Sequence, residues 1–199
     1  MILVQISDTH VDVSNSLVYG RFNTNTALEK AVSVINAMDP LPDLVLHTGD
    51  IASRGNVERY ERFLQIVDPL QVPIVLIPGN HDERGALRQV FSGTPMLPSN
   101  DEFLHYVIDS FPVRLICCDS VIADETPGEL CPTRLSWLSD RLDDAGCSMH
   151  KKVIKIEGAS TPHYLDTISG LVSGQMKCKR AGLTIVKLST SGTLLAQVD

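Results

Sequence analysis

Three short polar motifs in the first half of the chain each follow an apolar run of the length expected for a buried strand. In chain order the motifs are Asp8-Thr9-His10, Gly49-Asp50 and Gly79-Asn80-His81-Asp82, and the runs before them are residues 2–6, 44–46 and 74–77. Buried strands that alternate with helices form parallel sheets, and their carboxyl ends meet at the edge where α/β proteins bind ligands. We therefore expect the three motifs to converge on one site.

Apolar residues at helical spacing occupy the segments between these strands and predict helices at 26–38, 56–67 and 83–91. The last of these helices begins just after Asn80 and His81, so its electropositive N-terminus is expected to favour bound phosphate. For the second half we expect the following elements: strands at 104–108 and 113–118, a helix at 133–144 with Leu135, Leu138 and Leu142 on its apolar face, and a closing hairpin of 183–188 and 194–198. This alternation indicates the α/β class.

Length and composition limit the domain organisation and the partners. A chain of 199 residues with 43% hydrophobic content suffices for one core, and no repeat or linker divides it, so we expect a single domain over 1–199. The formal charge of -7 disfavours binding to a nucleic-acid polymer. No apolar run reaches membrane-spanning length, which disfavours a membrane partner. A small-molecule partner is expected, and assembly into a homo-oligomer is left open.

The five cysteines indicate the compartment. They are odd in number and lack Cys-x-x-Cys spacing, and Cys117 and Cys118 are adjacent in an apolar run, so we interpret them as packing residues of a protein in a reducing compartment. The chain opens directly into an apolar strand without a basic leader. We expect a cytoplasmic protein.

The residue types in the three motifs suit phosphoester hydrolysis. Anionic oxygens of a phosphate ester repel hydroxide, and two metal ions about 3.5 to 4 Å apart neutralise them and deprotonate the attacking water. Such ions require carboxylate, imidazole and amide ligands, which Asp8, His10, Asp50 and Asn80 offer. His81 is left to protonate the departing alkoxide or to hold the phosphoryl oxygens, since histidines exchange protons near physiological pH. Asp-x-His and Gly-Asp alone are more typical of a cap or turn, whereas Gly-Asn-His-Asp between a strand and a helix is uncommon for a plain turn, and all three in order favour a metal site.

In these motifs the sequence resembles the calcineurin-like metallophosphoesterases, and within them the bacterial class III cyclic-nucleotide phosphodiesterases and related glycerophosphodiesterases. The supporting strings are Gly79-Asn80-His81-Asp82-Glu83-Arg84, Cys118-Asp119-Ser120, Gly128-Glu129-Leu130 and Trp137-Leu138. The resemblance implies two packed mixed β-sheets flanked by helices. It also implies that Asp8, His10 and Asp50 hold one divalent ion and Asp50 and Asn80 a second, Mn²⁺ or Fe²⁺, while catalytic His81 acts on the substrate.

The resemblance ends after the Trp137-Leu138 helix. Members of this family continue into a His-His-Pro motif and later a Gly-His-x-His loop, which supply further metal ligands, and neither string is present here. One hypothesis aligns residues 147–151 with the second loop and retains His150 as a ligand of the first metal. His163 is a weaker candidate, because the Thr-Pro pair before it indicates an irregular segment.

Two functions follow from this partial ligand set. The first is a metal-dependent phosphodiesterase acting on small phosphodiesters, with 3′,5′-cyclic AMP favoured, by attack of a metal-bridging hydroxide. The second is a shortened, weakly active or non-catalytic relative that serves as a binding module. A natural chain with an additional internal segment is a third explanation for the missing motifs.

Other polar residues have structural explanations. His47 follows a buried strand and is expected to be a hydrogen-bonded interior histidine that orients a neighbouring group, and His105 to be structural. The 54–56 turn suits either a helix start or a phosphate contact. Arg84 suits either an anionic ligand or an acid on its own helix.

Overall fold

The computed structural model describes residues 1–14, 17, 23–99, 101–111, 113–146, 152–157 and 194–197. Its elements are, in chain order, β1 Ile2–Ile6, α1 Thr24–Asn36, β2 Leu44–His47, α2 Val57–Val67, β3 Ile74–Leu76, α3 Arg84–Phe91, β4 Tyr106–Ile108, β5 Val113–Cys118, α4 Pro132–Gly146, β6 Lys152–Glu157 and β7 Leu194–Gln197. The predicted helices and strands of the described residues are all present, with ends that differ by a few residues at most.

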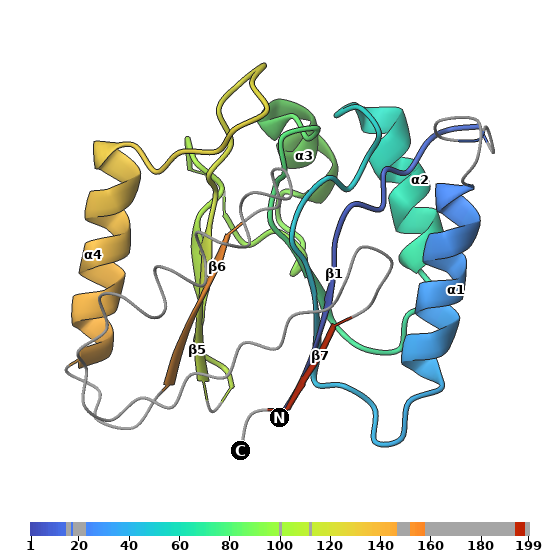
Figure 1. Ribbon diagram of the computed structural model, residues 1–199, viewed down its shortest axis with the longest axis horizontal. Coiled ribbons are helices and arrows are strands. Elements are labelled where there is room, and N and C mark those ends of the chain that lie inside the picture. Colours follow the sequence, from blue (N-terminus) through green and yellow to red (C-terminus); the bar gives the residue numbers. More distant parts are fainter. Residues whose placement is uncertain are drawn as a thin grey trace.

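The first sheet has the strand order β3-β2-β1-β7. β1 pairs in parallel with β2, and β2 with β3, whereas β7 pairs antiparallel with β1. The second strand of the predicted closing hairpin is β7, which lies at the edge of this sheet. The first strand of that hairpin, 183–188, lies outside the described residues. All three parallel strands end at the upper edge of the sheet in Figure 1.

The second sheet has the order β4-β5-β6, with β4 antiparallel and β6 parallel to β5. Both sheets are thus mixed. Figure 1 shows them face to face between α1 and α2 on one side and α4 on the other. The expected architecture of two packed mixed sheets flanked by helices is confirmed.

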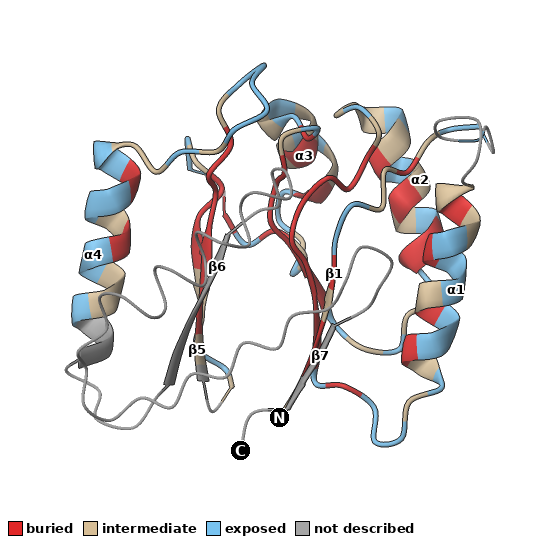
Figure 2. Cartoon of the chain, in the orientation of Figure 1, coloured by how far each residue is buried: buried red, intermediate tan, exposed pale blue. Residues whose placement is uncertain are grey.

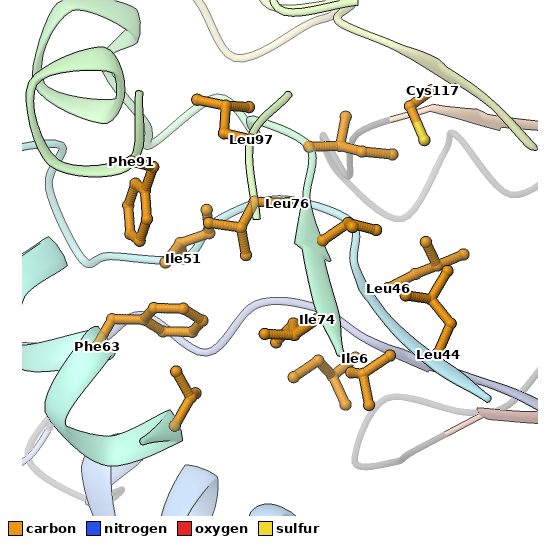
Figure 3. Close-up of a cluster of buried hydrophobic side chains, with 14 of the residues drawn as sticks. Ile6, Leu44, Leu46, Ile51, Phe63, Ile74, Leu76, Phe91, Leu97 and Cys117 are labelled. Carbon is orange, nitrogen blue, oxygen red and sulfur yellow. The ribbon is translucent and has the colours of Figure 1, made fainter. Parts of the chain in front are cut away.

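Strand β5 illustrates how the sequence pattern produces these layers. Leu115 and Cys117 belong to the core between the sheets, whereas Ile116 and Cys118 belong to a second cluster with Leu138 of α4. Alternate residues of a strand face opposite sides, so a strand covered on both faces is apolar along most of its length. Residues 115–118 of β5 are accordingly all buried, as the red part of this strand shows in Figure 2, and Figure 3 shows the side chains packed around Leu76. Cys117 and Cys118 are packing residues, as predicted.

The apolar face predicted for the 133–144 helix is wrong at one position. Leu138 of α4 is buried, but Leu135 is 51% exposed, and Arg134 takes the buried place instead. The Arg134 guanidinium donates to the backbone oxygens of Asp119 and Val121, which turns this helical face towards the end of β5. In the described part of the chain no helix is long and apolar enough to span a membrane.

Candidate metal centre

The three polar motifs lie in the loops that leave β1, β2 and β3 at one edge of the first sheet. Backbone hydrogen bonds continue past the ends of β1 and β2. The N–H of Asp8 donates to the oxygen of Gly49, and the N–H of His10 to the oxygen of Asp50, both at 3.0 Å. The first two loops therefore run side by side, and the expected convergence of the motifs is observed.

The third loop packs so closely against the second that there is no room for a side chain at Gly79. A Cβ atom at Gly79 would lie 2.3 Å from both the backbone nitrogen and Oδ1 of Asp50, so only glycine fits there. The N–H of His81 donates to Asp50 Oδ1 at 3.0 Å, and the N–H of Gly55 donates to the oxygen of His81 at 2.7 Å. These contacts fix the position of the His81 turn relative to Asp50.

The backbone of the candidate ligands is strained. Asp8, His10 and Asp50 have φ angles of 57°, 39° and 55°, in the left-handed region that residues other than glycine rarely adopt. Strain of this kind persists only where the surrounding structure holds it, and it gathers at functional sites. Three strained residues in two adjoining loops mark this edge of the sheet as a built site.

The side chains of this edge form a donor set suited to a divalent cation. His10, Asp50 and His81 each offer a ligand atom, and these atoms lie within 4.8 Å of one another. Asp8 Oδ1 and Asp50 Oδ2 each lie 3.9 Å from His10 Nε2. Imidazole and carboxylate donors at these separations fit Mn²⁺, Fe²⁺ or Zn²⁺. Asp8 is 54% exposed on its side chain, so the site opens to solvent on that side.

Asp50 is the centre of this set and its charge is costly without a cation. Burial raises the pKa of the Asp50 carboxyl, and the charge of Asp8 acts in the same direction, against the lowering effects of the His81 N–H and of the His10 and His81 rings. Since Oδ1 accepts the N–H of His81, Oδ2 is the oxygen that faces His10. A bound cation would offset the desolvation of this carboxylate.

His81 is oriented through its backbone and its ring. Ring atom Nδ1 lies 3.2 Å from the backbone oxygen of Ser53, which can only accept, so Nδ1 carries a proton and Nε2 is the atom available to a substrate or an ion. The His81 ring stands edge-on to that of His10, with 4.9 Å between centroids. The structure therefore places the His81 ring beside His10 and Asp50, and its predicted role as a proton donor stays a prediction.

Asn80 belongs to the same turn and is partly buried between Gly79 and His81. Its position is consistent with the predicted amide ligand, and that role stays a prediction. His150 and His163 lie outside the described residues. Within the described residues, the candidate ligands therefore all lie in the loops that follow strands of the first sheet.

His47 is the interior histidine that the sequence predicted. It is fully buried, and Nδ1 accepts the N–H of Gly49 at 3.3 Å. Nε2 therefore carries the proton and donates to Thr9 Oγ1 at 2.8 Å, and that hydroxyl donates to the oxygen of Ile51 at 2.9 Å. Burial lowers the pKa of His47 to about 3, with a smaller effect from His10, so the ring is neutral. The group that it orients is Thr9, which stands between Asp8 and His10.

Asp82 was part of a recognised motif, but its function could not be inferred from the sequence. The side chain is 6% exposed and accepts hydrogen bonds from the backbone of both adjoining loops. Burial raises its pKa to about 6, with a contribution from Asp50 in the same direction, against the lowering effect of its hydrogen bonds. The sequence signal was only its adjacency to His81.

The start of α3 corrects one expectation. Glu83 is the N-cap of α3, and its carboxylate accepts the N–H groups of Gly85 and Ala86, both at 2.7 Å. A side chain of this protein thus occupies the place expected for bound phosphate, because an acidic cap satisfies the free N–H groups of a first turn.

The interpretation that Arg84 pairs with an acid on its own helix is wrong, whereas contact with an anionic ligand stays a prediction. Its guanidinium donates to both carboxylate oxygens of Asp119, at 2.6 and 2.7 Å, and to the oxygen of Val121. Asp119 follows β5, so the acid that Arg84 pairs with is on another element and not on its own helix. This ion pair joins the His81 turn to the second sheet.

The two remaining predictions concern the 54–56 turn and His105. The 54–56 turn is a helix start, with Asn56 capping α2 and Arg54 exposed. His105 is 7% exposed, is stacked on Trp137 at 4.6 Å between ring centroids, and accepts the N–H of Asp119. These contacts support the structural role predicted for His105.

Comparison with known proteins agrees with the site. The profile of the calcineurin-like phosphoesterase family matches residues 1–162. A probable glycerophosphodiester phosphodiesterase of Arcobacter nitrofigilis is 40% identical over 72% of this chain and 52% of its own length. A 3′,5′-cyclic adenosine monophosphate phosphodiesterase of Pseudomonas aeruginosa is 32% identical over 73% of this chain and 51% of its own length.

A solved structure of a protein of unknown function from Aquifex aeolicus is 20% identical over 81% of each chain, with a TM-score of 0.41. The chain spans about half the length of the curated relatives it matches. The matched segment contains all three polar motifs and the strands that precede them. The chain therefore belongs to the calcineurin-like phosphoesterase family.

Proposed function

We propose that this protein is a metal-dependent phosphodiesterase that hydrolyses small phosphodiesters, with 3′,5′-cyclic AMP as the favoured substrate. The observation that carries the proposal is the convergence of ligand atoms of His10, Asp50 and His81 within 4.8 Å at the edge of the first sheet. Relatives named for glycerophosphodiesters and for cyclic AMP both support a small phosphodiester.

The residues have separate roles in this proposal. Asp8, His10, Asp50 and Asn80 would hold two divalent ions, Mn²⁺ or Fe²⁺, with His150 as an additional ligand of the first. When bound, such ions neutralise the phosphate and lower the pKa of water. Asp50, which has one oxygen engaged by the His81 N–H, would keep its carboxylate in a fixed orientation during turnover.

His81 is the catalytic residue of the proposal. Its Nδ1–H donates to Ser53, so only Nε2 can exchange a proton with the ester. The protonated ring would donate from Nε2 to the oxygen that leaves phosphorus, and would then regain a proton from water. The hydrogen bond to Ser53 holds the ring plane while this occurs.

A second function is favoured by a specific observation. The sequence contains neither the His-His-Pro nor the Gly-His-x-His string. A protein with this partial ligand set would bind an ion and a phosphodiester without efficient turnover. It would serve as a binding module of the same fold.

Hydrolysis assays separate the two functions. Bis(p-nitrophenyl) phosphate, cyclic AMP and a glycerophosphodiester would be supplied with Mn²⁺ to the wild type, Asp50→Ala, His81→Ala and the control Asp68→Ala, whose side chain is exposed at the end of α2. The phosphodiesterase predicts turnover that Asp50→Ala abolishes and Asp68→Ala leaves unchanged. Absence of turnover at every Mn²⁺ concentration, with cyclic AMP still bound, would establish the binding module instead.

We also propose that the protein acts in the cytoplasm as a small-molecule enzyme. The support is that Cys117 and Cys131 form no disulfide within the described residues, which is typical of reducing compartments.

A further inference from the structure

Asp82 is a buried acid next to the candidate metal centre, yet it forms no ion pair among the contacts of the described residues. Its side chain is 6% exposed. A buried carboxylate without a cation must be stabilised by hydrogen-bond donors, and the identity of those donors shows what it holds together.

The donors come from both loops that carry the ligands. Oδ2 accepts the N–H of Gly79 at 2.9 Å and that of Ile51 at 3.2 Å. Oδ1 accepts the N–H of Ala52 at 3.4 Å and the hydroxyl of Tyr60 at 3.0 Å. One carboxylate thus joins the segment directly after Asp50 to the turn directly before Asn80.

The arrangement is reciprocal. The carboxylate of Asp50, on the second loop, accepts the N–H of His81 on the third. The carboxylate of Asp82, on the third loop, accepts the N–H groups of Ile51 and Ala52 on the second. Each loop therefore supplies an acid to the backbone of the other, and a displacement of either loop breaks hydrogen bonds at both acids.

Only a carboxylate fits the place of Asp82. Four donors surround two oxygens, and every one of them presents a hydrogen to the side chain. An asparagine of the same shape has one oxygen, and its amide hydrogens would meet backbone N–H groups. Tyr60 compensates poorly, because accepting an amide hydrogen as well as the N–H of Glu83 would leave its own hydroxyl proton without the acceptor that Asp82 provides.

We propose that Asp82 is a positioning residue of the metal centre, whose carboxylate sets the separation between Asp50 and His81 by binding residues 51–52 to the Gly79 turn. It acts through the backbone and touches neither ion nor substrate. The part of this inference that concerns metal affinity rests on the proposed function, whereas the part that concerns the two loops does not.

The loops are tested first, in metal-free protein. Hydrogen–deuterium exchange would be compared for the wild type, Asp82→Asn and Asp68→Asn, which removes an exposed acid of the same type. We expect amides 51, 52 and 79 to exchange about tenfold faster in Asp82→Asn, with α1 unchanged and Asp68→Asn like the wild type. Unchanged exchange at these three amides would overturn the proposal.

Metal affinity is tested second, on variants that circular dichroism shows to be folded. Loss of a residue that orients ligands weakens metal binding by about 10- to 100-fold, so Mn²⁺ should bind Asp82→Asn that much more weakly than the wild type or Asp68→Asn. A purely structural role predicts lower stability with unchanged Mn²⁺ affinity, and that result would overturn the proposal.

Two further outcomes are distinguishable. If Asp82→Asn does not fold, Tyr60→Phe removes one of the four donors, and it must then show faster exchange at amide 52 for the proposal to hold. If the wild type itself binds no Mn²⁺, the proposed function fails, and the exchange measurement alone decides the role of Asp82.

Discussion

The folded protein should lose stability on mild acidification, because His47 takes up a proton in the unfolded chain but not in the folded one. The ring is fully buried, with Nδ1 accepting the N–H of Gly49 and Nε2 donating to Thr9. A second proton would have to displace the Gly49 N–H and would place a charge in the core beside Phe63, whose ring centroid lies 5.5 Å away. The folded state therefore keeps this ring neutral.

The sign and size of the effect follow from the pKa. Burial lowers the pKa of His47 from 6.5 to about 3, so below pH 6.5 the unfolded chain takes up the proton that the folded chain refuses. The stability that the neutral ring contributes is complete above pH 6.5 and is lost as the pH falls towards 3. At about 1.4 kcal/mol per pH unit, the loss reaches about 2 kcal/mol at about pH 5.

The assay is urea unfolding with EDTA present, at about pH 7.5 and about pH 5, of the wild type and His47→Gln. The variant has a neutral amide in place of the ring and cannot take up the proton, while every other acid titrates equally in both proteins. We expect the wild type to lose about 2 kcal/mol more than His47→Gln over this interval. Equal losses in the two proteins would refute the reasoning, and His47→Asn provides a second test if His47→Gln does not fold.

Three substitutions test other contacts by urea unfolding. Gly79→Ala should lower the free energy of unfolding by about 1–3 kcal/mol, because its Cβ would lie 2.3 Å from backbone and side-chain atoms of the neighbouring loop. An unchanged free energy of unfolding would contradict that packing. Arg84→Met should lower the free energy of unfolding by about 3–5 kcal/mol, because it leaves fully buried Asp119 without its cation. Arg62→Met, which removes an exposed ion pair, should lower it by at most about 1 kcal/mol. Similar losses in the two variants would disprove the distinction between the buried and the exposed pair. Asn56→Ala should cost about 1 kcal/mol with reduced helicity, since it removes the cap of α2, and unchanged circular dichroism would argue against it.

The secondary structure was predictable because its signals are local. β1 and β5 begin and end at the predicted residues, since each is a mainly apolar run that ends at a polar residue, Ser7 or Asp119. The convergence of the motifs was predictable for a related reason, because adjacent parallel strands end at one edge. Family resemblance supplied the second sheet, which local patterns alone did not specify.

Contacts between distant elements were not predictable in the same way. Nothing near Arg84 in the sequence indicates that its partner is Asp119, which is 35 residues away. The exposure of Leu135 depends on that same region, because Arg134 of the same helix turns inward to reach the end of β5. The errors in the sequence-based expectations thus cluster where α3, α4 and β5 meet.

Four acids that look alike in the sequence divide into two classes in the structure. Asp8, Asp50, Asp82 and Asp119 follow β1, β2, β3 and β5. Asp82 and Asp119 are saturated by backbone and guanidinium donors, so their oxygens have no capacity left for a metal ion. Asp8 is half exposed, and Asp50 has Oδ2 turned to His10. Since most of the saturating donors belong to other elements, no local pattern separates the two classes.

This division predicts unequal metal sites. The first ion would have Asp8, His10 and Asp50 as ligands, whereas the second would share Asp50 and have only Asn80 in addition within the described residues. Because each lost ligand weakens binding of a divalent ion, we expect an Mn²⁺ titration of the wild type to show one tighter and one much weaker step. His10→Ala should remove the tighter step and leave a weak one. Two steps of equal affinity would mean that residues outside the described part of the chain supply the second ion with further ligands.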